Sequence, residues 1–262
     1  GCRGPLCQSL EQGFDQFWCS RWSQPIRRLL RRRPGRMEAG VINDFLLSLT
    51  EPTVAAIYDL PPDLFEDPAV LTWHPGRAEV LFDRPGKGLV SRPGTARYLW
   101  RRLGECQGML QLVSPYLILT RGLRRELQRL RRQGIAIRLL TNSLASTDVP
   151  LVHGAYYRHR PWLLRQGIGL AELPASSGLS LHAKLILLGE REALLGSFNL
   201  DPRSFHLNTE LMLRLNSGPL CAELQAWLTH WQGVTAEPDP VSPWWRRLIA
   251  RLSHWLPLRP WL

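Results

Sequence analysis

The chain has 262 residues and 44% hydrophobic content, which is enough for one sizeable core with a small appendage. This composition excludes a disulfide-held miniprotein and a wholly disordered chain. No apolar run reaches the ~18 residues expected of a transmembrane helix. The net charge of +11 suits an anionic partner, such as nucleic acid, acidic lipid headgroups or a phosphate-bearing substrate.

The basic residues are unevenly divided, with 31 arginines and only two lysines, Lys87 and Lys184. In a chain that uses arginine almost everywhere, a retained lysine indicates a site that needs a compact ammonium group. The five cysteines are odd in number and have no metal-ligand spacing, which predicts a reduced, cytosolic protein. The start at Gly1, without a signal-peptide pattern, predicts a trimmed or incomplete chain.

Residues 1–40 form a helix-prone segment that ends in an arginine-rich run, and residues 41–68, rich in proline and aspartate, are predicted to be a linker. A strand at 78–82 and a turn at 85–88 follow. A regular alternation comes next, with helices predicted at 96–106, 122–132 and 149–165 and strands at 109–113, 135–140 and 168–173. Strands that alternate with helices predict an α/β layered domain with a largely parallel core.

The pattern changes near residue 180, where a hairpin is predicted at 183–188 and 193–195, then a strand at 211–215 and a helix at 219–231. His182 and Lys184, two residues apart on a predicted strand, would share one face of the sheet. Ser197 and Asn199 follow the next strand, and Glu210 begins a third. Imidazole can attack phosphorus or transfer a proton, while lysine and asparagine can bind phosphate oxygens. If the strands are neighbours, these residues predict metal-free phosphoryl transfer.

The spacing His182-x-Lys184, followed by Gly196-Ser197-x-Asn199, resembles the second signature motif of the phospholipase D superfamily. Segments 4–18, 113–116, 141–150, 196–204 and 208–210, with the Trp-rich tail, resemble its cardiolipin synthase-like branch. The resemblance covers nearly the whole chain. It implies a phospholipase D-like α/β/α sandwich over residues 69–233, which would be one half of the usual two-lobed molecule.

Two features depart from the family pattern. Such enzymes carry two copies of the motif, whereas only His182 has the His-x-Lys pattern here, so the chain is expected to be a second half. Residues 1–40 would then be a remnant that follows a missing first half. The position of the motif aspartate holds Gly189, which is expected to weaken local support rather than the chemistry.

The resemblance implies phosphatidyl transfer of the cardiolipin synthase type through a phosphohistidine, without a metal or organic cofactor. His182 is expected to be the general acid, and Glu210 to orient an imidazole of the opposite motif. The implied catalytic residues are His182, Lys184, Ser197, Asn199 and Glu210, and the implied substrate-binding residues are Asn208 and Arg203. The implied partners are an anionic, phosphatidylglycerol-type phospholipid, a membrane surface, and a first-half domain or a homodimer partner, with nucleic acid less favoured.

Three residues outside this group receive structural assignments. Lys87 lies in a Pro-Gly turn and is expected on the surface. Asp148 precedes a predicted helix and is expected to cap it together with Thr147.

The last segment, 234–262, is predicted to contain an amphipathic helix. At ~100° per residue its tryptophans and leucines fall on one arc and its arginines on the opposite one. This pattern predicts an interfacial helix, and hence a peripheral protein on the cytoplasmic face of a bacterial membrane. The alternative is a helix docked on the protein's own core. The expected membrane-associating residues are Trp244, Trp245, Arg246, Arg247, Arg251 and Trp255.

Two other functions stay open. One is a single-motif phosphodiesterase that completes its site as a homodimer and acts on nucleic acid, which the charge of +11 allows. The other is an inactive fragment of a two-motif enzyme, which Gly189 and the missing first motif favour.

Overall fold

The computed structural model describes residues 4–25, 28, 40–41, 44, 72–89, 93–234 and 244–252. The chain divides into two compact units, residues 1–20 together with 75–262, and residues 21–74. The helices and strands named below all belong to the first unit. Apart from Val41 and Asp44, the predicted linker at 41–68 lies outside the described residues.

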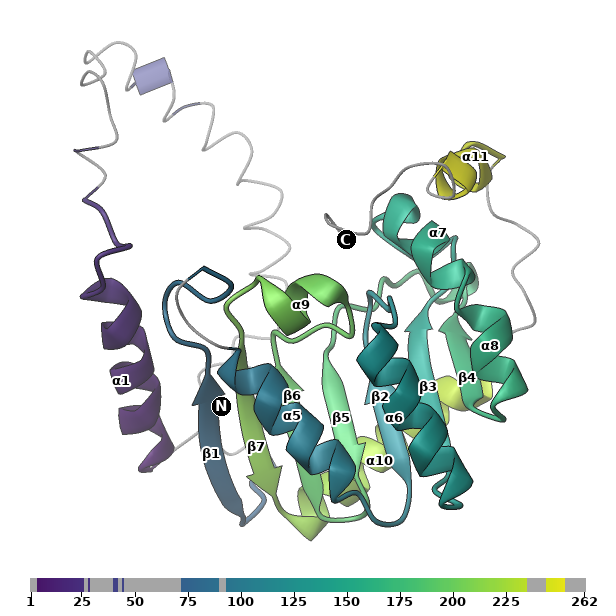
Figure 1. The fold of residues 1–262 in the computed structure, drawn as a ribbon, viewed down its shortest axis with the longest axis horizontal. Coiled ribbons are helices and arrows are strands. Elements are labelled where there is room, and N and C mark those ends of the chain that lie inside the picture. Colours follow the sequence, from purple (N-terminus) through teal and green to yellow (C-terminus); the bar gives the residue numbers. More distant parts are fainter. Residues whose placement is uncertain are drawn as a thin grey trace. The chain divides into compact units, whose positions relative to one another are not determined.

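Seven strands of the described chain form one mixed sheet in the order β1-β7-β6-β5-β2-β3-β4 (Figure 1). Among these strands only β2, β3 and β4 pair in parallel, and the remaining pairings are antiparallel. The three strands of the alternating region are therefore parallel, as predicted, but the sheet as a whole is not largely parallel. The short connection at 189–191 can only reverse the chain, because a parallel connection needs a crossover of a dozen or more residues. The strands are Arg77–Phe82 (β1), Leu110–Val113 (β2), Ile137–Asn142 (β3), Gly169–Leu173 (β4), Leu185–Leu188 (β5), Glu192–Gly196 (β6) and Leu211–Asn216 (β7).

The helices of the alternating region lie close to their predicted positions. In α6 (Arg121–Arg132) three leucines at helical spacing are buried, and the Thr120 hydroxyl accepts a hydrogen bond from the Leu123 amide at 3.1 Å, which caps the helix. The helix predicted at 149–165 is instead two helices, α7 (Pro150–Tyr157) and α8 (Arg160–Arg165). Pro161 explains the break, because proline has no amide hydrogen and belongs in the first turn of a new helix.

The remaining helices are α1 (Leu6–Trp18), α5 (Gly94–Gly104), α9 (Pro202–His206), α10 (Gly218–Val234) and α11 (Trp244–Leu252). Helix α1 packs along β1, where the Phe82 ring lies so close to Gly13 that an added Cβ would stand 3.2 Å away. Helix α1 therefore belongs to the same compact unit as the sheet. Within the described ranges, no helix combines the length and the apolar character needed to cross a membrane.

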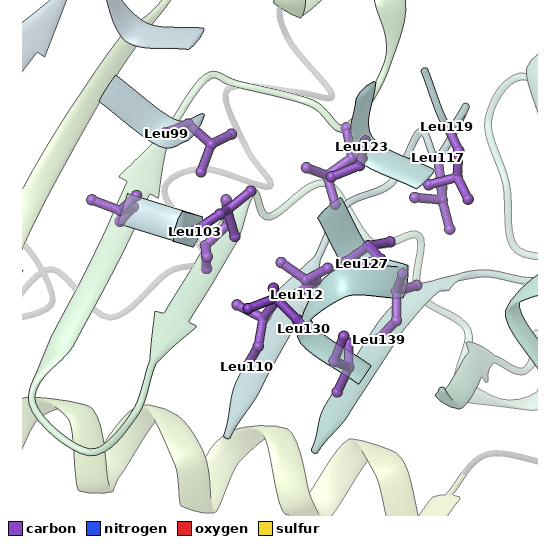
Figure 2. Close-up of a cluster of buried hydrophobic side chains, with 14 of the residues drawn as sticks. Leu99, Leu103, Leu110, Leu112, Leu117, Leu119, Leu123, Leu127, Leu130 and Leu139 are labelled. Atoms are coloured by element: carbon purple, nitrogen blue, oxygen red, sulfur yellow. The ribbon is translucent and has the colours of Figure 1, made fainter. Parts of the chain in front are cut away.

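Apolar side chains are buried on both faces of the sheet. On one face, leucines of α6 pack against leucines of β2 and β3, as Figure 2 shows. On the other face, Cys221 and Leu228 of α10 pack with Leu140 and Leu187 of the strands. Burial of each leucine side chain stabilises the folded state by about 1.5–3 kcal/mol relative to an exposed side chain. The two clusters fix the positions of the strands, and therefore also the positions of the polar residues at the strand ends.

Candidate active site

Strands β2 and β6 end, and strands β5 and β7 begin, at one edge of the sheet (Figure 1). Polar residues of the chain lie at these strand ends. The register pairs the last residue of β2, Val113, with the first of β5, Leu185. Leu185 pairs in turn with Leu195, near the end of β6. Antiparallel pairing therefore brings to one edge three segments that are separate in the sequence. Of the predicted catalytic residues, His182 and Lys184 precede β5, Ser197 and Asn199 follow β6, and Glu210 precedes β7.

His182 and Lys184 occupy different environments, although a strand would have put both on one face. They lie just before β5, so the alternation of strand side chains does not apply to them. His182 is exposed, whereas Lys184 is buried and its ammonium donates to the His182 carbonyl at 2.7 Å. Burial lowers the pKa of Lys184, and the charges of Glu210, Asp148 and Asp201 oppose that shift. A poorly hydrated cation bound to the backbone of His182, together with the accessible imidazole of that residue, suits the binding of a phosphate group.

Glu210 is buried and both of its carboxylate oxygens accept hydrogen bonds from serines. One oxygen accepts from the Ser197 hydroxyl, and the other accepts from the Ser204 hydroxyl at 2.7 Å. The Ser197 oxygen in turn accepts from the Leu211 amide at 3.0 Å. In this chain Glu210 thus ties the β6 end to the β7 start, and its predicted contact with an imidazole of an opposite motif stays a prediction.

Asn199 carries an unsatisfied polar atom. Its amide nitrogen in the backbone donates to the Ser204 hydroxyl at 3.1 Å, but its side-chain oxygen is buried and has no hydrogen-bond partner in the described part of the chain. An unpaired buried acceptor costs about 1–3 kcal/mol, so it calls for a donor.

A buried ion pair is hydrogen-bonded to the backbone of two residues of this cluster, Ser204 and Glu210. The Lys87 ammonium lies 2.6 Å from the Asp83 carboxylate, with both side chains fully buried, and also donates to the Ser204 carbonyl at 2.7 Å. Asp83 further accepts from the Thr95 hydroxyl at 2.7 Å and from the Glu210 amide at 3.1 Å. Burial alone would raise the pKa of Asp83, but the hydrogen bonds from Lys87 and Thr95 outweigh it and lower that pKa. The predicted surface position of Lys87 is wrong; its rarity as a lysine was the signal for its role.

The two predicted substrate-binding residues lie in helix α9 and just after it. Arg203 is exposed on α9, and Asn208 is half-buried after that helix. The Arg203 carbonyl accepts from the Asn208 amide at 2.8 Å. Asp201 caps α9 by accepting from the Ser204 amide at 2.8 Å, and burial raises its pKa. The contact of Arg203 and Asn208 with a substrate stays a prediction.

The segment that carries His182 is held by residues to which the sequence assigned no such role. The Asn142 side chain exchanges two hydrogen bonds with the Leu181 backbone, at 2.9 and 2.8 Å. The Tyr116 ring stands edge-on to the His182 ring, with centroids 6.2 Å apart, and its hydroxyl donates to Asp148 at 2.7 Å. Asp148 therefore binds Tyr116. The prediction that Asp148 caps α7 is wrong, because α7 has no side-chain cap.

An apolar cavity of about 240 Å³ opens beside His182. The imidazole forms part of its wall, while the rest is mostly leucine and tryptophan from β3, β4, α10 and the segment before β5. Its apolar lining includes Leu140, Leu173, Leu179, Leu181, Trp227 and Trp231. Among the described residues, no group of three or more His, Cys, Asp and Glu side chains could hold a metal ion.

Helix α11 exposes apolar side chains. Trp244 is 75% exposed, Leu248 is 51% exposed and Trp245 is 43% exposed. The helix packs against α7 (Figure 1), yet this apolar arc is not buried in the core. Arg247 is also exposed. Of Arg251 only the backbone is described, and Trp255 lies outside the described residues.

Arg246 binds backbone carbonyls of the protein. Its guanidinium is half-buried, and Nη1 donates to three backbone carbonyls of the loop after β3, those of Leu144 at 3.0 Å, Ala145 at 3.0 Å and Thr147 at 2.8 Å. Arg246 therefore connects α11 to the loop after β3, and its association with a membrane stays a prediction.

Gly189 stands far from this cluster along β5. The site lies at the beginning of the strand, whereas Gly189 follows its end and donates its amide to the Met109 carbonyl at 2.9 Å. Its φ is 65°, in the left-handed region, and an added Cβ would lie 3.0 Å from the Gln107 carbonyl oxygen. A carboxylate missing from this turn therefore removes nothing from the polar cluster itself.

Replacing Gly189 with alanine is expected to lower the free energy of unfolding by roughly 1 kcal/mol, because an L side chain is strained at positive φ. Gly189→Asp should behave similarly. Denaturant midpoints measure the change. Gly104→Ala is the matched control, since that helical glycine has open space around its Cβ position and should be neutral or slightly stabilised. Equal midpoints for the two alanine variants would contradict the requirement for glycine.

Comparisons with known proteins identify the family of the chain. The family described as "Cardiolipin synthase, PLD-like domain" matches residues 99–231, half of the chain and the part that holds the polar cluster. The chain belongs to this family. Cardiolipin synthase C of Escherichia coli K12 is 29% identical over 310 aligned positions, which cover 99% of this chain and 64% of that protein. Cardiolipin synthase A of Pseudomonas aeruginosa LESB58 is 29% identical over 55% of this chain and 28% of its own length. The chain thus spans less than two thirds of these relatives.

The chain is also similar to solved structures, including the following two. Phosphatidylserine synthase of Haemophilus influenzae has 17% sequence identity and a TM-score of 0.49, covering 62% of this chain and 39% of its own. NucT from Helicobacter pylori has 13% identity and a TM-score of 0.49, covering 62% of this chain and 99% of its own.

Proposed function

We propose that this chain is the second half of a phosphatidyltransferase of the cardiolipin synthase type, with His182 as general acid. The observation that carries the proposal is the apolar cavity whose wall includes His182, next to a buried lysine. A phosphodiester at His182 would have a cation for its charge and an apolar space for its organic substituent. A second imidazole would come from a first half or a partner subunit.

In the proposed reaction, the second imidazole attacks the phosphorus of phosphatidylglycerol and forms a nitrogen–phosphorus bond. The phosphorus–oxygen bond to the headgroup glycerol breaks, and His182 protonates the leaving alkoxide. The hydroxyl of another phosphatidylglycerol then attacks the phosphohistidine while His182 takes up its proton. The products are cardiolipin and glycerol, and both imidazoles return to their initial state. Lys184 would bind the non-bridging oxygens throughout.

The lining of the cavity supports a lipid rather than a nucleic acid substrate. Nucleic acid sites use basic grooves with exposed aromatic rings on which bases stack. Here Trp227 and Trp231 lie edge to face with centroids 6.4 Å apart, and they close the wall of a space otherwise lined by leucines. Transfer of a hydrocarbon chain from water into such a space is favourable by about 25 cal/mol per Å² of apolar surface buried.

The purified chain is expected to make no cardiolipin as a monomer, because one motif supplies one imidazole and the reaction needs two. Cardiolipin formation from phosphatidylglycerol vesicles, with sedimentation to establish the oligomeric state, measures this. Adding the N-terminal part of the Escherichia coli relative tests whether a first half restores turnover. Robust turnover by a true monomer would overturn the need for a second half, and its failure in every assembly would overturn the proposed reaction.

A homodimeric phosphodiesterase is the second candidate, which the charge of +11 allows. In the same preparations, cleavage of a single-stranded oligonucleotide by a dimer, without cardiolipin formation, would support this candidate over the first.

Helix α11 is proposed to dock on an anionic bilayer through its exposed apolar residues, with Arg247 and Arg251 near the headgroups. The double variant Trp244→Ser/Leu248→Ser is expected to lose most of its co-sedimentation with phosphatidylglycerol vesicles. Added salt should weaken binding of the unaltered chain, and neutral vesicles should bind less of it. Trp18→Ser is the matched control, because Trp18 on α1 is 69% exposed. Unchanged binding of the double variant would rule out α11 as the anchor.

A further inference from the structure

His182 has little support of its own. Its side chain is exposed, and the residue lies in an irregular segment before β5. The direction of its ring therefore depends on neighbouring side chains. The described contact is the Tyr116 ring, edge-on at an interplanar angle of 81° and a centroid distance of 6.2 Å.

Tyr116 is itself oriented by a carboxylate. Its hydroxyl donates to Asp148 at 2.7 Å. Burial, together with the Asp148 hydrogen bond and charge, raises the pKa of Tyr116 to about 12, so the phenol remains a donor throughout the neutral range. The direction of the Tyr116 ring therefore depends on where the loop after β3 places Asp148.

That loop is bound by the C-terminal helix. Arg246 Nη1 donates to three carbonyls of the loop, the last of which belongs to Thr147, the residue before Asp148. A guanidinium that is half-buried against three oriented carbonyls holds the backbone more firmly than one exposed hydrogen bond would. The same loop follows Asn142, the last residue of β3, whose side chain binds the backbone of Leu181 next to His182.

We propose that Tyr116 is a positioning residue for His182 and that Arg246, through the loop at 144–148, sets the place of Tyr116. The series of contacts has three steps. Arg246 of α11 binds the loop, Asp148 of the loop accepts from the Tyr116 hydroxyl, and the Tyr116 ring contacts the His182 imidazole. Because the same helix exposes Trp244 and Leu248, membrane docking of α11 and the orientation of His182 share one mechanical connection. The membrane part of this inference rests on the proposed function, whereas the positioning of His182 does not.

The test follows His182 directly by NMR of the full chain with ¹³C-labelled histidine rings. The His182→Gln variant identifies the His182 resonance by its absence. Arg246→Gln and Tyr116→Phe are each expected to shift or broaden that resonance, because each releases part of the series. Arg246→Lys should restore the unaltered resonance, since an ammonium has three donors for three carbonyls. Arg125→Gln removes the same charge from an exposed position on α6 and should change nothing at His182.

Coupling between the two positions separates positioning from general loosening. If Arg246 acts through Tyr116, adding Arg246→Gln to Tyr116→Phe should produce little further change at His182. Unaltered resonances of the remaining histidines report that the fold is intact. An unchanged His182 resonance in Arg246→Gln, or full additivity of the two substitutions, would overturn the proposal. Because the measurement requires no turnover, its outcome is independent of whether the chain proves to be a phosphatidyltransferase.

Discussion

Lys87→Met is expected to lower the free energy of unfolding by about 3–5 kcal/mol, because it leaves a carboxylate buried without its cation. Lys87 and Asp83 are both fully buried, and their charged atoms lie 2.6 Å apart. The Glu210 amide also binds Asp83, so the start of β7 should lose order with the pair. Chemical denaturation with two spectroscopic probes measures the change.

The matched control for Lys87→Met is Glu79→Gln, which breaks a solvent-exposed pair. Glu79 is 56% exposed in its side chain and lies 3.2 Å from Arg214. Exposed pairs typically contribute ~0–1 kcal/mol, so this variant should hardly change stability. Similar losses for the two variants would contradict a special role for the buried pair.

The pH dependence of stability should change sign with the same substitution. In the unaltered chain the pKa of Asp83 is lowered in the folded state, so its contribution is complete above the ordinary value of 3.8 and lost as the pH falls through the lowered pKa. Without Lys87, burial should raise that pKa. The variant should then become more stable, not less, as the pH falls through the raised pKa toward the ordinary value of 3.8. An unchanged pH profile would contradict this account.

His182→Gln is expected to reduce turnover by roughly 10²–10⁴-fold in any assembly of this chain that is active, because it removes the proposed proton donor. The exposed position of His182 means that folding should be unaffected. Lys184→Ala should also be severe, and the two substitutions together should cost less than the product of their separate effects, since both serve one step. Initial rates and denaturant midpoints of the same preparations measure these effects.

His230→Gln controls for the loss of an exposed histidine, since His230 lies on α10 and should leave turnover unchanged. Retained activity in His182→Gln would show that the reacting group lies elsewhere in the assembly.

The sequence and the structure differ most where a long-range contact decides the outcome. Asp83 and Glu210 lie 127 positions apart, and Lys87 reaches a carbonyl 117 positions away. Neither distance leaves a periodic signal, so the Pro-Gly turn around Lys87 alone suggested a surface residue. Arg246 is similar: the helical arc predicts an arginine opposite the tryptophans, but its guanidinium lies over the Trp245 ring, 5.1 Å from the centroid. The carbonyls that it binds are about a hundred positions earlier.

By itself, the sequence determined the positions of the strands, to within two residues at each end, and five members of the polar cluster, namely His182, Lys184, Ser197, Asn199 and Glu210. Those properties depend on local periodicity and on the spacing of a short motif. Only the tertiary structure decided the order in which the strands lie side by side in the sheet and the burial of the Asp83–Lys87 pair. Each of these depends on which distant segment lies alongside, because the free energy of a buried polar group is set by its partners in space and not by its neighbours in the chain.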